Sequence, residues 1–305
     1  KITDIDIIIG GPPCQAYSLV GRARDENGME DDKRNYLYKL YIRFLAEYSP
    51  KAFIFENVPG ILTASNGTIF KNLKAYMRRV GYNIEARKLD ASEFGVSQKR
   101  KRVIIVGWRK DLEFKYPFVE TKDSKHIVND ILKDLPFLNA GEACKSFDYN
   151  FYVSKALKAQ KLRNSEDVLT HHISRTNIAR DLEIYKTVVN VWNLEKRRLK
   201  YTELNDELIT HNNLKSFLDR FKVVAGDEKY SHTVVAHISK DGHHYIHPDI
   251  EQNRSLTVRE AARLQSFPDD YYFEGPRTSN FVQIGNAVPP LMAEKLAIWF
   301  KQNIK

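Results

Sequence analysis

The sequence predicts an α/β fold in which a doubly wound parallel sheet carries a second, smaller and less regular domain. In the first third of the chain, short apolar runs of strand length alternate with apolar residues at helical spacing. The strand-length runs are almost uninterrupted, as in strands buried on both faces. With 305 residues, the chain can form one large domain or two ordinary ones. Such sheets bind ligands at the carboxyl ends of their strands, so chemistry is expected there.

The elements of the first third follow one another in order. Residues 5–9, 52–55 and 103–106 are continuous apolar runs that read as buried strands. Helical spacing runs from Leu37 to Pro50, where proline stops the pattern, and from Phe70 to Gly81, a residue suited to a left-handed cap.

The regular alternation is lost from about Trp108 to Asn253, where charge clusters and polar loops dominate. Helical order returns after Thr257, which has Glu260 at the spacing of a capping box, and a last helix follows Pro290. We therefore expect an inserted domain, and a C-terminal return to the first domain. The expected segments are 1–108 for the α/β domain, 109–253 for the insertion and 254–305 for the return.

The composition favours a polyanionic partner. Lysine and arginine number 48 against 39 acidic residues, a formal charge of +9. A merely solvated basic surface explains the charge equally well. No apolar stretch is long enough to cross a bilayer and no secretory pattern opens the chain, so a cytoplasmic location is expected. The two cysteines, Cys14 and Cys144, are too few for a disulfide framework or a zinc cluster.

Two strand ends carry candidate catalytic side chains. Cys14 follows the sequence GGPP at the end of the first strand, where the prolines stiffen the backbone and would hold the thiol at the ligand edge of the sheet. Glu56 ends the second strand, and a carboxyl group whose pKa is raised by burial could act as an acid toward a ring nitrogen. A buried structural cysteine and a surface glutamate are the alternatives.

A basic segment precedes the third strand. If that strand continues the alternation, Arg100 and Arg102 point to one face, and Lys99 and Lys101 to the other. Two guanidinium groups on one side suit a phosphate or the carbonyl of a base. A solvated basic edge is the alternative.

These segments resemble, in order, motifs of the DNA (cytosine-5)-methyltransferases of the bacterial modification type. Six ordered blocks at both ends of the chain make the resemblance specific. The blocks are GGPPCQ at 10–15, DKRNYL at 32–37, ENV at 56–58, QKRKR at 98–102, RSLTVRE with RLQSFP at 254–268, and QIGNAV at 283–288.

The resemblance implies transfer of a methyl group from S-adenosyl-L-methionine to carbon 5 of a cytosine flipped out of double-stranded DNA. The Cys14 thiolate would add to carbon 6 of the base, and Glu56 would protonate or hydrogen-bond ring nitrogen 3. Arg102, with Arg100 beside it, would hold the base carbonyl.

The same resemblance implies further binding residues. The implied DNA contacts, in a loop that closes over the DNA, are Gln15, Ser18, Arg22 and Arg24. The implied cofactor contacts are Pro13, Leu37, Asn286, Ala287 and Val288. The insertion at 109–253 is similar by position to the target-recognition domain of the family.

One part of the family pattern is missing from this sequence. The family normally opens with a Gly-rich turn and acidic residues that bind the cofactor, and nothing of this kind precedes Gly10. We therefore expect a sheet without its first strands, and poor or no cofactor binding by the chain alone. Three explanations stay open: a truncated chain, a split enzyme whose second chain supplies those strands, and a degenerate protein kept for DNA binding.

Other functions are weighed against this one. An RNA (tRNA) cytosine-5 methyltransferase of the same fold would share Cys14 and Glu56, but the long insertion and the loop sequence YSLVGR look more like the DNA enzymes. A non-catalytic DNA-binding module would need no nucleophile. A dinucleotide-binding oxidoreductase is disfavoured because no G-x-G-x-x-G follows any strand.

Overall fold

The computed structural model describes residues 5–13, 36–116, 124–145 and 148–303. By its internal contacts the chain divides into two compact units. Unit 1 comprises Lys1–Asp90, Lys101–Glu120 and Leu296–Lys305, and unit 2 comprises Ala91–Arg100 and Thr121–Lys295. Residues 254–295, which we expected to return to the first domain, have most of their contacts within unit 2.

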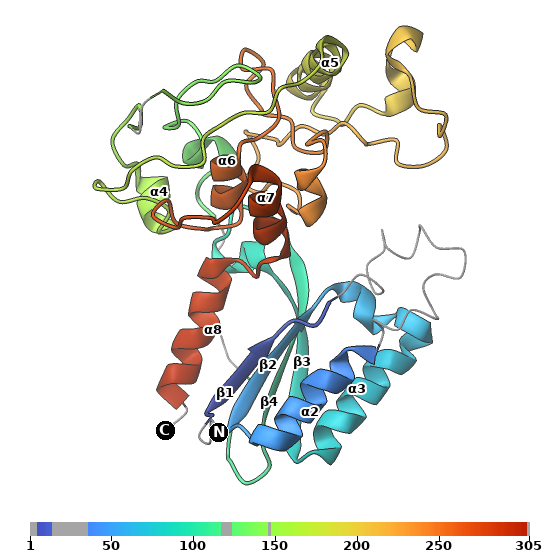
Figure 1. The fold of residues 1–305 in the computed structure, drawn as a ribbon, viewed down its shortest axis with the longest axis vertical. Helices are drawn as coiled ribbons and strands as arrows, with labels where there is room; N and C mark the ends of the chain where they lie inside the picture. Colours follow the sequence, from blue (N-terminus) through green and yellow to red (C-terminus); the bar gives the residue numbers. More distant parts are fainter. Residues whose placement is uncertain (1–4, 14–35, 117–123, 146–147, 304–305) are drawn as a thin grey trace. The chain divides into compact units, whose positions relative to one another are not determined.

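Unit 1 is built on a mixed sheet whose described strands are ordered β1-β2-β4-β3 (Figure 1). The strands are β1 Ile7–Gly10, β2 Ala52–Asn57, β3 Tyr82–Asp90 and β4 Lys101–Arg109. β1 and β2 are parallel, and β4 is antiparallel to both β2 and β3. The α/β fold is thus confirmed, but the prediction of a parallel sheet is wrong at β4.

The reversal of β4 has its origin in β3, a strand that we did not expect. β3 contains the charged residues Glu85, Arg87, Lys88 and Asp90 and is only partly buried, because it forms an edge of the sheet. The chain then passes through residues 91–100 of unit 2 and returns beside β3, and antiparallel pairing follows from this return. Since β4 lies between β3 and β2, it also runs against β2.

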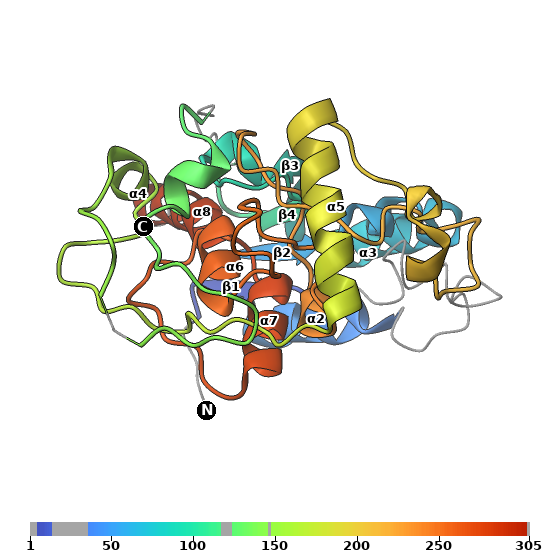
Figure 2. The same cartoon turned by 90° about the horizontal axis from the view of Figure 1, so that it is seen from above.

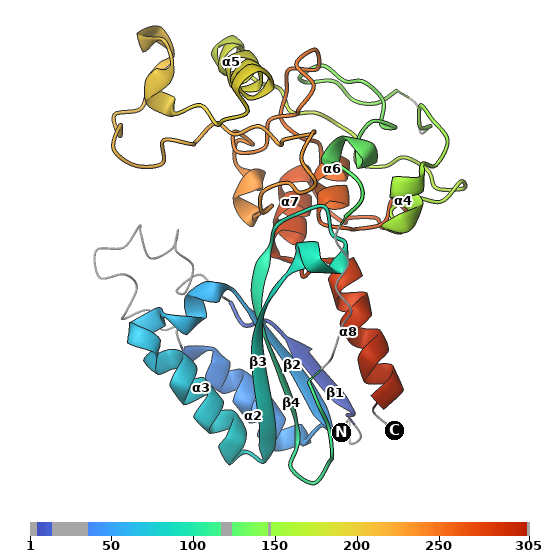
Figure 3. The ribbon, with the colours of Figure 1, turned by 180° about the vertical axis from the view of Figure 1, so that it is seen from behind.

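Helices α2 (Tyr38–Tyr48) and α3 (Thr68–Arg79) lie side by side against one face of this sheet (Figure 3). Tyr41 of α2 packs edge-on against Phe53 and Phe55 of β2, and its hydroxyl donates to the carbonyl of Ile54 at 2.9 Å. The predicted cap at Gly81 is confirmed, since its φ of +101° lies in the left-handed region.

Unit 2 has little regular structure besides its helices. These are α4 Lys155–Ala159, α5 Ala179–Glu195, α6 Val258–Leu264, α7 Arg277–Asn286 and α8 Pro290–Asn303, whose last turns belong to unit 1. Short 3₁₀ helices are Pro59–Leu62 and Ala64–Gly67 in unit 1, and Ala91–Phe94, Val128–Ile131, Tyr201–Glu203, Asp206–Leu208 and Ala236–Ser239 in unit 2. α6 and α7 pack together in the larger core of this unit (Figure 2).

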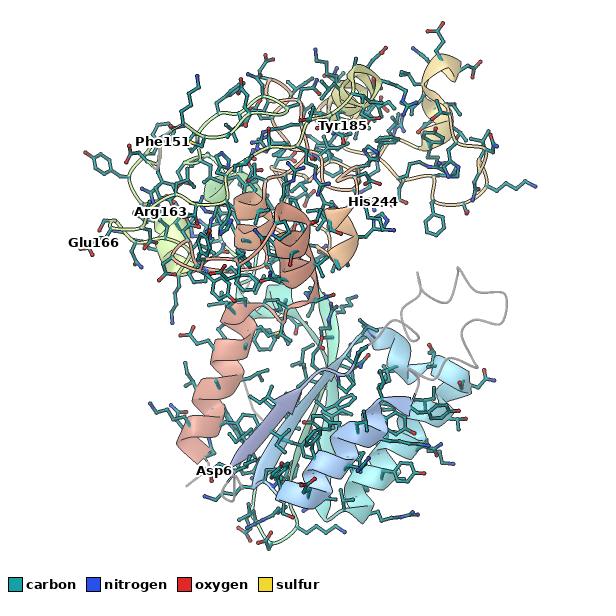
Figure 4. All side chains as sticks on the ribbon, viewed as in Figure 1. Asp6, Phe151, Arg163, Glu166, Tyr185 and His244 are labelled. Atoms are coloured by element: carbon teal, nitrogen blue, oxygen red, sulfur yellow. The ribbon has the colours of Figure 1, made fainter. Side chains whose placement is uncertain are left out.

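The predicted capping box at the start of α6 is confirmed. The backbone N–H of Glu260 donates to Thr257 Oγ1 at 3.2 Å, and the backbone N–H of Thr257 donates to Glu260 Oε2 at 2.7 Å. The long helix α5 was not expected. It packs Tyr185, labelled in Figure 4, and Val188 into a second core with Phe221. Within the described residues, no helix is both long and apolar enough to cross a membrane.

Candidate active site

The carboxyl ends of β1 and β2 meet, because these strands are parallel and Gly10 pairs with Phe55. Asn57, which is buried, donates from Nδ2 to the carbonyl of Pro12 at 3.1 Å and accepts the N–H of Val58 at Oδ1. Asn57 therefore anchors the backbone two residues before Cys14. Cys14 itself lies outside the described residues, as do the candidate DNA contacts Gln15, Ser18, Arg22 and Arg24.

Glu56 and Arg102 are brought together at this edge of the sheet. Arg102 Nε lies 2.7 Å from Glu56 Oε1, and their side chains are 10% and 18% exposed. Arg102 Nη1 also donates to its neighbouring carbonyl, that of Lys101. A charge-assisted hydrogen bond between two partly buried groups fixes the orientation of both. An oriented carboxylate and a guanidinium group therefore lie together at the sheet edge where β1 and β2 end.

Gly11 belongs to the glycine pair that precedes Cys14, and the structure shows why a residue without a side chain stands at this position. A Cβ atom at this position would lie 2.8 Å from Glu56 Oε2 and 3.4 Å from the carbonyl oxygen of Glu56. Contacts below 3.0 Å force a displacement, so a larger residue at position 11 would push against the carboxylate. The glycine allows the segment before Cys14 to run close to Glu56.

Arg100 does not follow the predicted alternation with Arg102. It precedes the first residue of β4, belongs to unit 2 and is fully buried. Its Nη1 donates to the carbonyl of Val234 at 2.7 Å, and its Nη2 to that of Gly285 at 2.9 Å. The prediction of a shared face assumed that the strand extends back through residue 100, whereas it begins at Lys101.

The predicted cofactor residues fall in both units. In unit 1, Pro13 is exposed after β1, and Leu37 is half-buried just before α2. In unit 2, Asn286 is the exposed last residue of α7, and Ala287 and Val288 are half-buried after it.

The arginines of the RSLTVRE and RLQSFP blocks have a role that sequence reasoning missed. Arg254 binds both carboxylate oxygens of the buried Glu260, at 2.8 and 2.7 Å. Burial alone would raise the pKa of Glu260, but the charge and hydrogen bonds of Arg254 hold it well below its usual value. The signal available in the sequence was the density of charged residues within an otherwise apolar helix.

A second buried network surrounds Arg263. Its guanidinium contacts the carboxylates of Asp269 and Asp134, and Asp134 also accepts from Arg163 at 2.6 Å. Arg163, labelled in Figure 4, stacks over the ring of Tyr149, with its guanidinium carbon 3.6 Å from the ring centre. These arginines hold unit 2 together from inside. Over the described part of the chain, no group of three or more His, Cys, Asp and Glu side chains could hold a metal ion.

Comparison with known proteins gives one family. The sequence model of the C-5 cytosine-specific DNA methylases matches residues 1–301. The Type II methyltransferase M.Bpa9945I of Bacillus paralicheniformis is 48% identical over 97% of this chain and 70% of its own length. M.AgeI of Thalassovita gelatinovora is 32% identical over 96% and 82%, and M.DdeI of Desulfomicrobium norvegicum is 32% identical over 100% and 75%.

Solved structures support the fold. An Escherichia coli prophage protein described as a DNA modification methyltransferase aligns with a TM-score of 0.66 at 23% identity, over 99% of this chain and 80% of that one. The Entamoeba histolytica methyltransferase EhMeth aligns with a TM-score of 0.58 at 14% identity, over 98% and 78%.

Proposed function

The chain belongs to the C-5 cytosine-specific DNA methylase family, and from this membership we propose that it methylates carbon 5 of a cytosine in double-stranded DNA, with Cys14 as the nucleophile. The structural observation that carries the proposal is the Glu56–Arg102 pair at the sheet edge where Asn57 anchors the segment before Cys14.

The chemistry requires a nucleophile because carbon 5 of cytosine is itself unreactive. Addition of the Cys14 thiolate to carbon 6 forms a carbon–sulfur bond and moves the electrons of the 5,6 double bond to carbon 5, which takes the methyl group. Removal of the carbon 5 proton and expulsion of the thiolate restore the aromatic ring. The base cannot be attacked within the stack, so it must first leave the duplex.

Glu56 and Arg102 act on the ring in this proposal. Glu56 in its protonated form would give its proton to ring nitrogen 3 as the adduct forms, and its carboxylate would then accept the new N–H and take the proton back when the thiolate leaves. Arg102 orients Glu56 and contacts the base carbonyl. Arg100 supports the fold of unit 2 through backbone carbonyls, in place of the base contact expected for it. Gln15, Ser18, Arg22 and Arg24 are proposed as DNA contacts, and the segment 109–253 as the region that recognises the target sequence.

Within each unit, the described candidate residues have the chemistry to contact part of S-adenosyl-L-methionine, the methyl donor of the family. Pro13 and Leu37 offer apolar surface, and the exposed amide of Asn286 can hydrogen-bond a polar ligand, with Ala287 and Val288 beside it. When bound, the cofactor would supply an electrophilic methyl group.

A finer proposal concerns β1, which lies at an edge of the described sheet. β1 pairs with β2 alone among the described strands, and Ile9 is 69% exposed. We propose that this edge accepts a further strand, from a preceding segment or a second chain, that carries the other cofactor contacts.

Covalent trapping tests the function. The protein is incubated with S-adenosyl-L-methionine and duplex DNA containing 5-fluorocytosine, together with the N-terminal segment of the Bacillus paralicheniformis relative in trans if the chain alone binds no cofactor. The wild type and the matched control Cys144→Ser should form a denaturation-resistant adduct, and Cys14→Ser should form none. Equal trapping of all three proteins would show that Cys14 is not the nucleophile.

The substrate class is tested by methylating duplex DNA and tRNA side by side with labelled S-adenosyl-L-methionine. Labelling of tRNA but not of duplex DNA would overturn the proposed DNA substrate.

A further inference from the structure

The 285–291 turn, which comprises the end of α7, the connection and the start of α8, is held by two segments that are distant from it in the sequence. Arg100 Nη2 donates to the carbonyl of Gly285 at 2.9 Å, and Gln265 Nε2 donates to that of Ala287 at 2.7 Å. The N–H of Leu291 donates to Ser266 Oγ at 3.1 Å. The turn contains the three candidate cofactor residues of unit 2.

Two buried glutamines, Gln98 and Gln265, form a relay behind this turn. Gln98 Oε1 accepts the N–H of Val234 at 2.9 Å, and Gln98 Nε2 donates to Gln265 Oε1 at 2.6 Å. Both side chains are fully buried. Because the oxygen of Gln265 is taken by Gln98, its nitrogen must face the Ala287 carbonyl. A buried amide that lost such a partner would pay the full desolvation cost, so the relay has one favourable orientation.

The start of the turn is fixed by close packing as well. A Cβ atom on Gly285 would lie 2.2 Å from the backbone nitrogen of Ala236 and 2.4 Å from the carbonyl carbon of Val235. Arg100 bridges the same two segments, since it binds the carbonyls of Val234 and Gly285. The end of α7 is therefore both pressed and hydrogen-bonded against this part of unit 2.

We infer that the glutamine relay, Gln98 and Gln265, together with Arg100, positions the 285–291 turn so that Asn286, Ala287 and Val288 are preorganised for the cofactor. The relay acts through the Ala287 carbonyl and does not need to touch the cofactor. A turn that is ordered before binding loses less conformational entropy when the ligand arrives. The inference rests on the proposed function for the role of Asn286 to Val288, whereas the ordering of the turn stands on unit 2 alone.

Gln265→Glu tests the relay with little change in volume. The carboxylate still accepts from Gln98 but cannot donate to Ala287, and it places a negative charge against that carbonyl. We expect amide hydrogen exchange across residues 285–291 to accelerate about tenfold or more, and the KM for S-adenosyl-L-methionine to rise about tenfold, as for the loss of one buried hydrogen bond. The kcat and the KM for DNA should stay within about twofold, because the reacting groups lie elsewhere.

Gln160→Glu is the matched control. Gln160 is also buried in unit 2, and its amide exchanges hydrogen bonds with Ser97 at 2.8 and 3.0 Å. This variant should leave both the exchange of the turn and the KM for the cofactor unchanged. If Gln265→Glu fails to fold, Gln98→Glu serves instead, because it keeps the bond from Val234 and loses the bonds to Gln265 and to the Leu264 carbonyl.

The readouts separate the inference from the proposed function. Equal exchange and equal KM in Gln265→Glu and Gln160→Glu would overturn the positioning role. If the wild type, with the N-terminal segment of the relative supplied, shows no cofactor binding or methyl transfer, the proposed function fails. In that case, faster exchange at 285–291 in Gln265→Glu would still support the ordering of the turn.

Discussion

Glu56 is oriented by the Arg102 guanidinium at Oε1, and the missing side chain of Gly11 leaves space for Oε2. Arg102 and Gly11 stand at different strand ends, and each can be altered without removing the carboxylate. Substitutions at positions 102 and 11 therefore separate the orientation of Glu56 from its presence.

Arg102→Lys should lower the rate of methyl transfer while the protein stays folded. Lysine keeps the charge but loses the planar Nε–H that meets Glu56 at 2.7 Å. A hydrogen bond to a charged group contributes about 1.5–3 kcal/mol, so the single-turnover rate should fall about 10- to 100-fold. The matched control is Arg109→Lys on the same strand, whose exposed pair with Asp111 should contribute almost nothing to the rate. Equal rates for both variants would contradict the orienting role of Arg102.

Gly11→Ala should have a similar effect by a different route. The added Cβ atom would lie 2.8 Å from Glu56 Oε2, so the carboxylate must move. The required displacement is only a few tenths of an ångström, below the roughly 1 Å that can cost about 100-fold in rate, so the loss should be smaller than about 100-fold. Single-turnover methylation measures the effect, and the midpoint of thermal unfolding shows whether the fold survives. A fully active Gly11→Ala enzyme would show that Glu56 tolerates the displacement.

At the scale of elements, the sequence predicted those whose local pattern is strong. β1, β2 and β4 are apolar runs, α2 and α3 have clear helical spacing, and the start of α6 has its capping box. β3 was not predicted because a partly exposed edge strand with four charged residues has no apolar run. In α5 the signal was present, since Ile184, Tyr185, Val188 and Val189 lie at helical spacing.

The positions of the site residues depended on tertiary structure more than the positions of these elements did. Strand positions alone would have put Glu56, at the carboxyl end of β2, and Arg102, near the start of β4, at opposite edges of the predicted parallel sheet. The two side chains meet because β4 is antiparallel to β2, and only the family resemblance had assigned both to one base. Arg100 could not be placed, because its environment depends on residues 91–100 leaving the sheet for unit 2, and no local pattern encodes that path. Tertiary contacts of this kind override the alternation of a strand.

The start of α6 depends on a buried ion pair, and breaking it from one side should be costly. Arg254→Met leaves the Glu260 carboxylate buried without its main counter-charge, which should lower the free energy of unfolding by about 3–5 kcal/mol. Adding Glu260→Gln should recover part of this loss, because it removes the isolated charge. Arg197→Met, which breaks exposed pairs with Glu195 and Glu203, is the control and should cost less than about 1 kcal/mol. Denaturant unfolding measures all four proteins, and a double variant no more stable than Arg254→Met would contradict the argument.

At the scale of the whole molecule, the chain has a formal charge of +9, and part of one basic cluster is paired with acidic residues. In the cluster of Lys196, Arg197, Arg198 and Lys200, Lys196 binds Asp227 at 2.6 Å, and Arg197 binds Glu195 and Glu203. A net positive charge attracts a polyanion such as DNA through a long-range field. Such a field speeds association and weakens as salt is added.

The pH dependence of stability should be dominated by imidazoles that unit 2 buries in their neutral form. Burial, with the nearby Arg254, lowers the pKa of His247 from 6.5 to about 4, and burial, with Lys222, lowers that of His232 from 6.5 to about 3. The unfolded chain therefore binds protons first as the pH falls. The contributions of these two histidines to the free energy of unfolding should be fully present above about pH 7. They should decline as the pH drops through 6.5, and the decline should end near pH 4 for His247 and near pH 3 for His232.

Glu260 is an acidic residue, but it too stabilises the protein less as the pH falls. Its pKa is lowered in the folded protein, so its contribution to stability is present above the ordinary pKa of 4.5 and declines as the pH falls below it.

Denaturant unfolding at steps from pH 8 to pH 4 should show a continuous decline in the free energy of unfolding. His247→Gln should make the decline between pH 6.5 and pH 4 shallower by about one proton. A free energy that stays constant from pH 7 to pH 5, or an unchanged slope in His247→Gln, would mean that these histidines accept protons without unfolding unit 2.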